Sequence, residues 1–344
     1  MYQVNDKTEL TPKVLQDFLQ DFIDRVQPNL ILDTLYALGR NPKILNREIP
    51  EDSGPDNRIP VSYAKRIVNI VAGYMFKPGY VNYGFEDDTF GDTMNEVFAE
   101  NNEPVKTTEM GKQSTTHGIG YEYHYVDVDG SGAVPRFVRI IAEEVVPIFN
   151  RDVEPKLIAF MRVTNAVRRE KKKEEKFLEI MFVDDVAIVQ FEAKENGTSL
   201  KVIEDPVRHF YGEVPLAIYR NNAELEGDFA AVEPLIDSYD VLVSDSMNEF
   251  DRFAWAYLLL KGMALSPEDA ARLKRTRTFE NLDDKDAVSF LTKTIDTAFI
   301  EFMTDLVRSE IHRQSGIPNI EDFDGTGASG KTITKFIYIC SSFL

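Results

Sequence analysis

The chain has 344 residues, of which 43% are hydrophobic, and it carries a formal net charge of −19. This length suits more than one subdomain with substantial cores, while so acidic a surface argues against sequence-specific DNA binding through a basic footprint. A single cysteine, Cys340, excludes an internal disulfide. The four histidines lie too far apart for a local metal signature; they are His117, His124, His209 and His312. The N-terminus lacks a signal pattern, and no run approaches the roughly 18 apolar residues that span a bilayer, so we expect no membrane segment.

The first third of the chain has helical periodicity. Thr11 and Pro12 offer start chemistry for a first helix through Val26, and a second begins at Pro28. A proline-rich connector then leads to a helix over 61–76. Two more helices are predicted over 89–100 and 105–116.

From Gly120 onward the hydrophobic period changes to two, which predicts β-hairpins. Expected strands are 121–126 with 137–141, 157–163 with 177–183, 186–191 with 200–203, and 215–219. The charged run 168–176 interleaves lysine and arginine with glutamate, and we interpret it as a solvated hairpin loop without a function.

Apolar residues recur every three or four positions over 231–262, and this spacing predicts one long helix. Its polar stripe contains Asp237, Asp240, Ser244, Asn248 and Asp251. A second long helix is predicted over 296–315, after a polar interval that includes a short helix near Pro267. Two long helices of this kind commonly find partners in other subunits, and a closed ring is one solution.

The sequence GTGASGKT, residues 325–332, matches the phosphate-binding P-loop pattern. A P-loop follows a buried apolar strand and opens a nucleotide-binding sheet. Here residues 316–324 contain a proline and three acids, and only twelve residues follow Thr332. We therefore favour a flexible glycine loop and keep nucleotide binding as the alternative. No catalytic triad or complete metal site is readable, so we expect no enzyme activity, no cofactor and no metal.

An ordered series of short motifs resembles the portal proteins of tailed bacteriophages, of the type found in siphophages of Gram-positive hosts. The motifs are residues 57–69 (NRIPVSYAKRIVN), Gly73-Tyr74, residues 118–122 (GIGYE), residues 220–222 (RNN), residues 227–229 (GDF), residues 235–240 (LIDSYD), Ser244-Asp245, residues 323–325 (FDG) and Ser329-Gly330.

This resemblance implies an α+β fold with a helical and β-hairpin wing domain and two long stem helices flanking a small clip module. The wing would occupy 1–230 (helical 1–117, β-rich 118–230), the stem helices 231–262 and 296–316, and the clip 263–295. Residues 317–335 would form the tunnel loop. The residues 336–344 are an apolar tail where the family continues into a helical crown, so we expect a truncated chain.

The resemblance also implies three sets of site residues. The tunnel loop facing DNA would contain Asp324, Gly325, Thr326, Gly327, Ala328, Ser329, Gly330 and Lys331. Stem acids facing the channel, which would repel phosphates and let DNA slide, are Asp237, Asp240, Asp251, Glu301 and Asp305, with an outward solvated face as the alternative. The clip would contact the terminase or adaptors through Arg272, Lys274, Arg275 and Arg277.

As a member of this family the chain would form a ring, typically a dodecamer, at one vertex of the capsid, where double-stranded DNA is packaged and ejected. Implied partners are the terminase large subunit, the head-completion or adaptor proteins, the scaffold and the major capsid protein. The ring would assemble in the bacterial host cytoplasm and end in the virion. A capsid or adaptor protein without a central channel is the remaining structural alternative.

Overall fold

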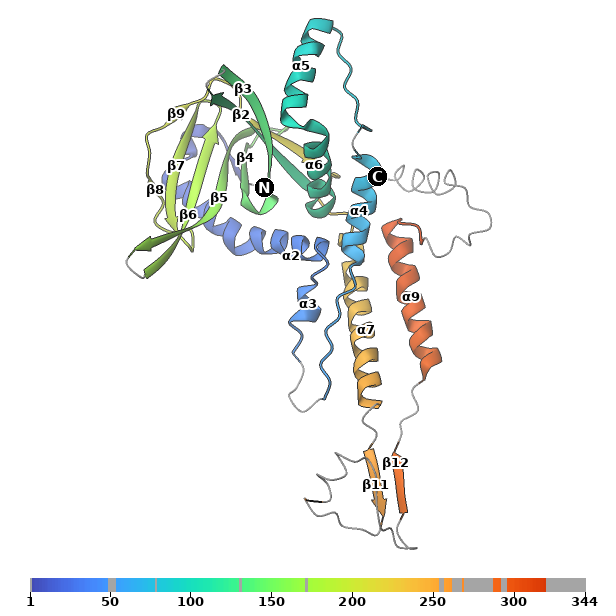
Figure 1. The fold of residues 1–344 in the computed structure, drawn as a ribbon. Coiled ribbons are helices and arrows are strands. Elements are labelled where there is room, and N and C mark those ends of the chain that lie inside the picture. Colours follow the sequence, from blue (N-terminus) through green and yellow to red (C-terminus); the bar gives the residue numbers. More distant parts are fainter. Residues whose placement is uncertain are drawn as a thin grey trace. The chain divides into compact units, whose positions relative to one another are not determined.

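The structure, a computed structural model, describes residues 2–48, 54–77, 79–129, 132–170, 173–253, 257–261, 268, 287–291 and 296–319. The chain divides into two compact units (Figure 1). Unit 1 comprises residues 1–42, 62–234 and 312–344, and unit 2 comprises residues 43–61 and 235–311, each within the described ranges. Each unit is therefore built from segments that are far apart in the sequence.

Helices dominate the first third of the chain, as the periodicity predicts. Helix α1 (Pro12–Asp21) begins after Thr11, whose hydroxyl accepts a hydrogen bond from the Val14 N–H, with proline in the first turn. The other helices of this part are η1 (Lys7–Glu9), η2 (Phe22–Val26), α2 (Gln27–Ala37), α3 (Pro42–Leu45), α4 (Tyr63–Met75), α5 (Asp88–Asn101) and α6 (Glu103–His117). The element η2 is a π-helical turn that joins α1 to α2.

The larger sheet of unit 1 has the strand order β1-β4-β5-β6-β7-β8, with β9 also on β7. Its strands are β1 (Tyr2–Val4), β4 (Val145–Asn150), β5 (Leu157–Glu170), β6 (Lys173–Asp184), β7 (Ala187–Lys194), β8 (Lys201–Val202) and β9 (Val207–Arg208). All these pairings are antiparallel except β1 on β4, which places Tyr2 opposite Ile148. The short 3-10 helix η4 (Ala142–Glu144) leads into β4.

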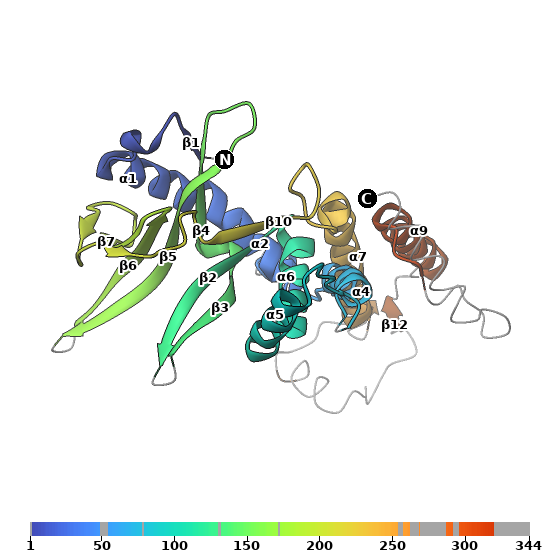
Figure 2. The same cartoon turned by 90° about the horizontal axis from the view of Figure 1, so that it is seen from above.

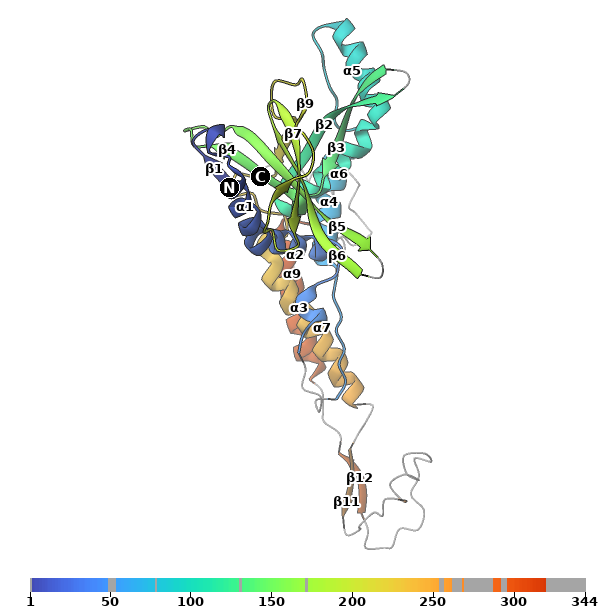
Figure 3. The same ribbon diagram turned by 90° about the vertical axis from the view of Figure 1, so that its left-hand side faces the viewer.

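The smaller sheet of unit 1 has the order β10-β2-β3 and is entirely antiparallel. Its strands are β2 (Ile119–Asp129), β3 (Gly132–Ile140) and β10 (Leu216–Arg220). Hairpins β2–β3 and β5–β6 project as separate arms of unit 1 (Figures 2 and 3). The expected hairpins are thus confirmed, and the expected α+β class with them.

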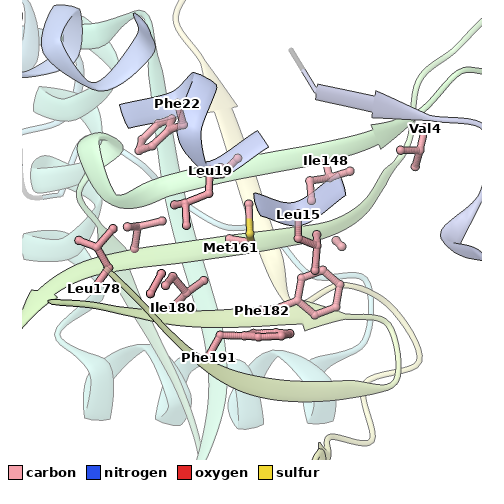
Figure 4. Close-up of a cluster of buried hydrophobic side chains, with 14 residues drawn as sticks. Val4, Leu15, Leu19, Phe22, Ile148, Met161, Leu178, Ile180, Phe182 and Phe191 are labelled. Carbon is pink, nitrogen blue, oxygen red and sulfur yellow. The ribbon is translucent and has the colours of Figure 1, made fainter. Parts of the chain in front are cut away.

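The main core lies between α1 and the larger sheet. Leu15, Leu19 and Phe22 recur at helical spacing and point at the sheet, as Figure 4 shows. The facing sheet residues include Ile148, Met161, Ile180 and Phe191, from four different strands. A second cluster joins the two sheets; it contains Tyr121, Ile140, Ala142, Val145, Phe160, Val183 and Leu216.

The outer edge of β3 is covered by side chains from α5 and α6. The Asn101 amide donates to the Pro135 carbonyl (3.0 Å) and accepts from the Phe137 N–H (3.2 Å), and Lys106 donates to the Phe137 carbonyl. Gln113 donates to the Ile140 carbonyl at 2.8 Å. Because an edge strand exposes unpaired backbone groups, these contacts close the edge to further strand pairing.

The charged run 168–176 is not a loop over its whole length. Strand β5 continues to Glu170 and β6 starts at Lys173, so the described part of the run is a paired ribbon. Arg168 lies over the Phe177 ring at 4.7 Å and bonds Glu192 at 2.7 Å, while Arg169 pairs with Glu174 at 2.9 Å. The interpretation as a solvated loop was wrong because opposite charges on neighbouring strands support pairing.

In unit 2, the predicted helix over 231–262 ends earlier than expected. After the 3-10 turn η5 (Ala230–Val232) in unit 1, helix α7 spans Glu233–Phe253. Residues Tyr257–Lys261 form strand β11, antiparallel to β12 (Ala287–Leu291). An apolar run such as YLLL fits a helix or a strand equally well by periodicity, which explains the error. The predicted second long helix is confirmed as α9 (Thr297–Ser315).

Among the described residues, no helix combines the length and hydropathy needed to cross a bilayer.

Candidate functional site

In unit 2, residues 54–61 form an extended connector that lies along the polar stripe of α7 (Figure 1). Three acceptors on α7 receive three backbone N–H groups of the connector. The Asn57 N–H donates to Asn248 Oδ1 at 2.7 Å, the Ile59 N–H to Ser244 Oγ at 3.0 Å, and the Val61 N–H to Asp240 Oδ1 at 2.7 Å. We call this arrangement the connector ladder.

The ladder works because two repeats match in length. Acceptors four residues apart on a helix are separated by about 6 Å along the axis. Alternate N–H groups of an extended chain point the same way and are separated by about 6.6 Å. Asp240, Ser244 and Asn248 are 0%, 0% and 5% exposed, so each buried polar group of the ladder has a partner.

Two basic side chains that precede the connector in sequence also bind α7. Lys43 pairs with Asp237 at 2.8 Å, and Arg47 holds both oxygens of Asp245 at 2.7 and 3.2 Å. The bond to Asp245 raises the pKa of Arg47 above its ordinary value. The bidentate arginine–carboxylate geometry fixes direction as well as distance.

This packing bears on the predicted stem acids. Asp240 is fully buried beneath the connector, so the prediction that it faces a channel is wrong. Asp237 bonds Lys43, and Asp251 accepts from the Asn57 amide at 2.6 Å. On α9, Glu301 and Asp305 are exposed, and Asp305 accepts from Arg308 at 2.6 Å.

The C-terminal end of α9 is held within unit 1. His312 Nδ1 bonds the Ile317 carbonyl at 3.0 Å, and its ring meets Tyr63 edge to face at 5.9 Å. Ile317 is only 7% exposed. This anchor fixes the chain at the first residue of the segment predicted to be the tunnel loop, residues 317–335.

Two predicted sites lie outside the described residues. These are the tunnel-loop residues 324–331, which include the P-loop-like sequence, and the basic clip residues Arg272, Lys274, Arg275 and Arg277. Within the described ranges, no group of three or more histidine, cysteine, aspartate or glutamate side chains could hold a metal ion.

Sequence reasoning missed the connector as the partner of the α7 stripe. A signal was present, since Asp240, Ser244 and Asn248 recur every four residues with acceptor side chains. Their donors come from residues about 180 to 190 positions upstream, which no local pattern reveals.

Residues 23–334, most of the chain, match the family described as phage portal protein, SPP1 Gp6-like. The chain therefore belongs to the phage portal protein family, and the predicted resemblance is confirmed. Portal proteins are structural, and this family places the chain in the virion, as expected. The match includes the P-loop-like sequence, residues 325–332.

Two relatives are portal proteins of phages. The chain is 21% identical to that of Clostridium phage phiCD119 over 311 residues, covering 86% of this chain and 68% of the relative. It is 20% identical to that of Bacillus phage SPP1 over 297 residues, covering 83% and 58%. The chain thus spans about three fifths to two thirds of the length of these relatives.

A solved structure shows a similar fold. The neck of an empty gene transfer agent particle, computed with C6 symmetry, matches with a TM-score of 0.50 at 12% identity. The match covers 91% of this chain and 75% of that chain.

Proposed function

We propose that this chain is the subunit of a portal ring through which double-stranded DNA enters and leaves the capsid. The family match carries the proposal. The exposed apolar residues of the long helices support it, because one subunit leaves them uncovered: Met247 and Phe250 on α7, and Phe299, Phe302 and Leu306 on α9. A twelve-subunit ring is the expected assembly.

In this proposal unit 1 is the wing, α7 and α9 are the stem, and the β11–β12 hairpin belongs to the clip. The clip would dock the terminase large subunit during packaging and the head-completion proteins afterwards, through Arg272, Lys274, Arg275 and Arg277. The scaffold and the major capsid protein would meet the assembled ring in the host cytoplasm. The tunnel loop, residues 324–331, would touch passing DNA. The role is structural, without catalysis.

Electron microscopy and native mass spectrometry of the purified chain test the ring. The expected particle has a central channel and a mass that is a whole multiple of the 39.2 kDa subunit. A monomer, or an assembly without a channel, would contradict the proposal; the latter would favour the capsid or adaptor alternative. Nucleotide binding lost on Lys331→Ala would favour the P-loop alternative.

The channel acids need a separate test. Glu301 and Asp305 are exposed on α9 and would repel phosphates, which keeps counterion-dependent binding of DNA weak. Replacing both with lysine is expected to slow or arrest packaging. The matched control reverses Glu154 and Glu204, exposed acids of unit 1. Unchanged packaging by the Glu301 and Asp305 variant would reject the repulsive role.

A further inference from the structure

A cavity of about 460 Å³ lies within unit 1, between helices α2, α4 and α6 and the end of β3. Leu38 and Ile141, which are 51% and 39% exposed, form part of its apolar wall. Three basic side chains also line it: Lys65, Lys112 and Arg139. The lining also includes two acids, Glu109 and Glu143. We call this cavity the α2–α6 socket.

Two buried nitrogens of the socket residues lack hydrogen-bond partners among the described residues, namely His117 Nδ1 and Arg139 Nε. His117 is only 8% exposed, and the Asp33 oxygen lies 3.7 Å from its Nδ1, beyond good hydrogen-bond distance. Since buried polar groups in folded proteins are normally satisfied by protein or water, these two nitrogens are open to a polar group that enters the socket.

The acids of the socket are already engaged. Glu109 lies 3.9 Å from the Arg139 guanidinium, and Glu143 accepts a hydrogen bond from the Thr34 hydroxyl. Lys65 and Lys112 form no ion pair with any residue that the structure describes. The socket therefore offers two available ammonium groups, which suit an occupant that presents carboxylates.

Helix α5 has the complementary surface. It lies at one extremity of unit 1 (Figures 1 and 3). Its exposed acids recur every four residues as Asp88, Asp92, Glu96 and Glu100, and the helix has no lysine or arginine. Like charges four apart destabilise a helix, and acids in its last turn also oppose the helix dipole.

The acids of α5 do not reach the α2–α6 socket of their own subunit. Helix α5 ends where α6 begins, whereas Lys112 and His117 lie towards the other end of α6, about 13 Å or more along its axis. A ring is built from two different surfaces that meet between neighbours. One subunit carries both members of such a pair.

We propose that the acids of α5 dock into the α2–α6 socket of a neighbouring subunit, with Asp88 and Asp92 facing Lys65 and Lys112. This inference rests on the proposed ring and names one of its contacts. The contact is heterologous, since each subunit gives its helix to one neighbour and its socket to the other.

Charge exchange tests the contact. The variants are Asp88→Lys with Asp92→Lys, Lys65→Glu with Lys112→Glu, and all four together. Ring formation is measured by native mass spectrometry as a function of concentration. Each pair alone is expected to raise the concentration for half assembly by at least about tenfold, and the four changes together to restore much of the loss.

The control reverses Glu154 and Glu204 to lysine, which gives the same change in net charge as the α5 variant. Far-ultraviolet circular dichroism and thermal unfolding establish that each variant is folded. If both charge-reversed variants assemble into rings as readily as the wild type, the proposed contact is wrong, although the proposed ring stands. Loss of assembly in both variants without rescue by the combination would also overturn it. A wild-type chain that forms no ring would instead contradict the proposed function.

Discussion

At the scale of single residues, two portal-like motifs close one loop of unit 1. Asn221 donates to Asp228 Oδ1 at 2.7 Å, and Asn222 exchanges hydrogen bonds with the backbone of Glu226. The Asp228 N–H donates to the Thr115 carbonyl at 2.8 Å. A Cβ on Gly227 would lie 2.1 Å from the Thr116 carbonyl oxygen, so only glycine fits there. These contacts give the RNN and GDF motifs a structural reason.

Asp228 gives a pH prediction at this scale. Burial raises the pKa of its carboxyl above the ordinary 3.8, although the Asn221 hydrogen bond opposes this, and its Oδ2 has no partner among the described residues. The folded state therefore binds the proton more tightly than the unfolded state. The resulting stabilisation is present below the ordinary pKa and is lost as pH rises through the raised pKa.

We expect Asp228→Asn, which cannot ionise, to remove this pH dependence. Near neutral pH the variant should gain a small amount of unfolding free energy, about 1 kcal/mol. Urea unfolding of the variant and the wild type between about pH 4 and pH 7 measures it. Asp205→Asn, at an exposed acid, is the control. The same pH slope in Asp228→Asn and the wild type would refute this assignment.

At the scale of elements, the connector ladder predicts the effect of one hydroxyl. Ser244→Ala removes the acceptor of the partly buried Ile59 N–H. An unsatisfied buried donor costs about 1–3 kcal/mol, which here lowers the free energy that holds the connector on α7. Amide hydrogen exchange at Ile59 should accelerate by about tenfold or more, since 1.4 kcal/mol corresponds to tenfold.

Ser246→Ala is the matched control for the ladder, because the Ser246 hydroxyl bonds only the Leu242 carbonyl of its own helix in the contacts that the structure shows. Exchange at Ile59 should be unchanged in that variant. Equal exchange in both variants would mean that the ladder does not hold the connector.

The covered edge of β3 gives a second prediction for an element. Asn101→Ala leaves the Pro135 carbonyl and the Phe137 N–H without their side-chain partner, and Asn101 itself is 3% exposed. We expect a loss of about 2–3 kcal/mol in the stability of unit 1, measured by urea unfolding. Thr93→Ala, on the exposed side of α5, should change little. Similar stability of both variants would show that the Asn101 side chain does not stabilise the edge of β3.

The elements also show where sequence reasoning reaches its limit. Local periodicity predicts α1, α4 and the hairpins, because their partners are on the same helix face or in the next strand. It does not predict β1, whose partner β4 lies more than 140 residues away, or the end of α7 at Phe253. For the site, periodicity locates the polar stripe of α7. The stripe's burial under a distant connector follows only from the tertiary structure.

At the scale of the whole molecule, assembly depends on surfaces that one subunit leaves uncovered. On α9, Phe299, Phe302 and Leu306 recur at spacings of three and four and are 59%, 62% and 43% exposed. They therefore lie on one face of the helix. Burying an exposed phenylalanine contributes about 1.5–3 kcal/mol, and in a closed ring every interface gains this term.

We expect Phe299→Ser with Phe302→Ser to prevent ring formation and leave a folded monomer. Both rings are largely solvent-exposed in one subunit, so their loss should change the thermal unfolding temperature little. Native mass spectrometry and analytical ultracentrifugation measure the assembly. Val202→Ser with Val207→Ser, at exposed apolar residues of β8 and β9, is the control and should still assemble. Normal rings from the α9 variant would show that this face is not part of the interface.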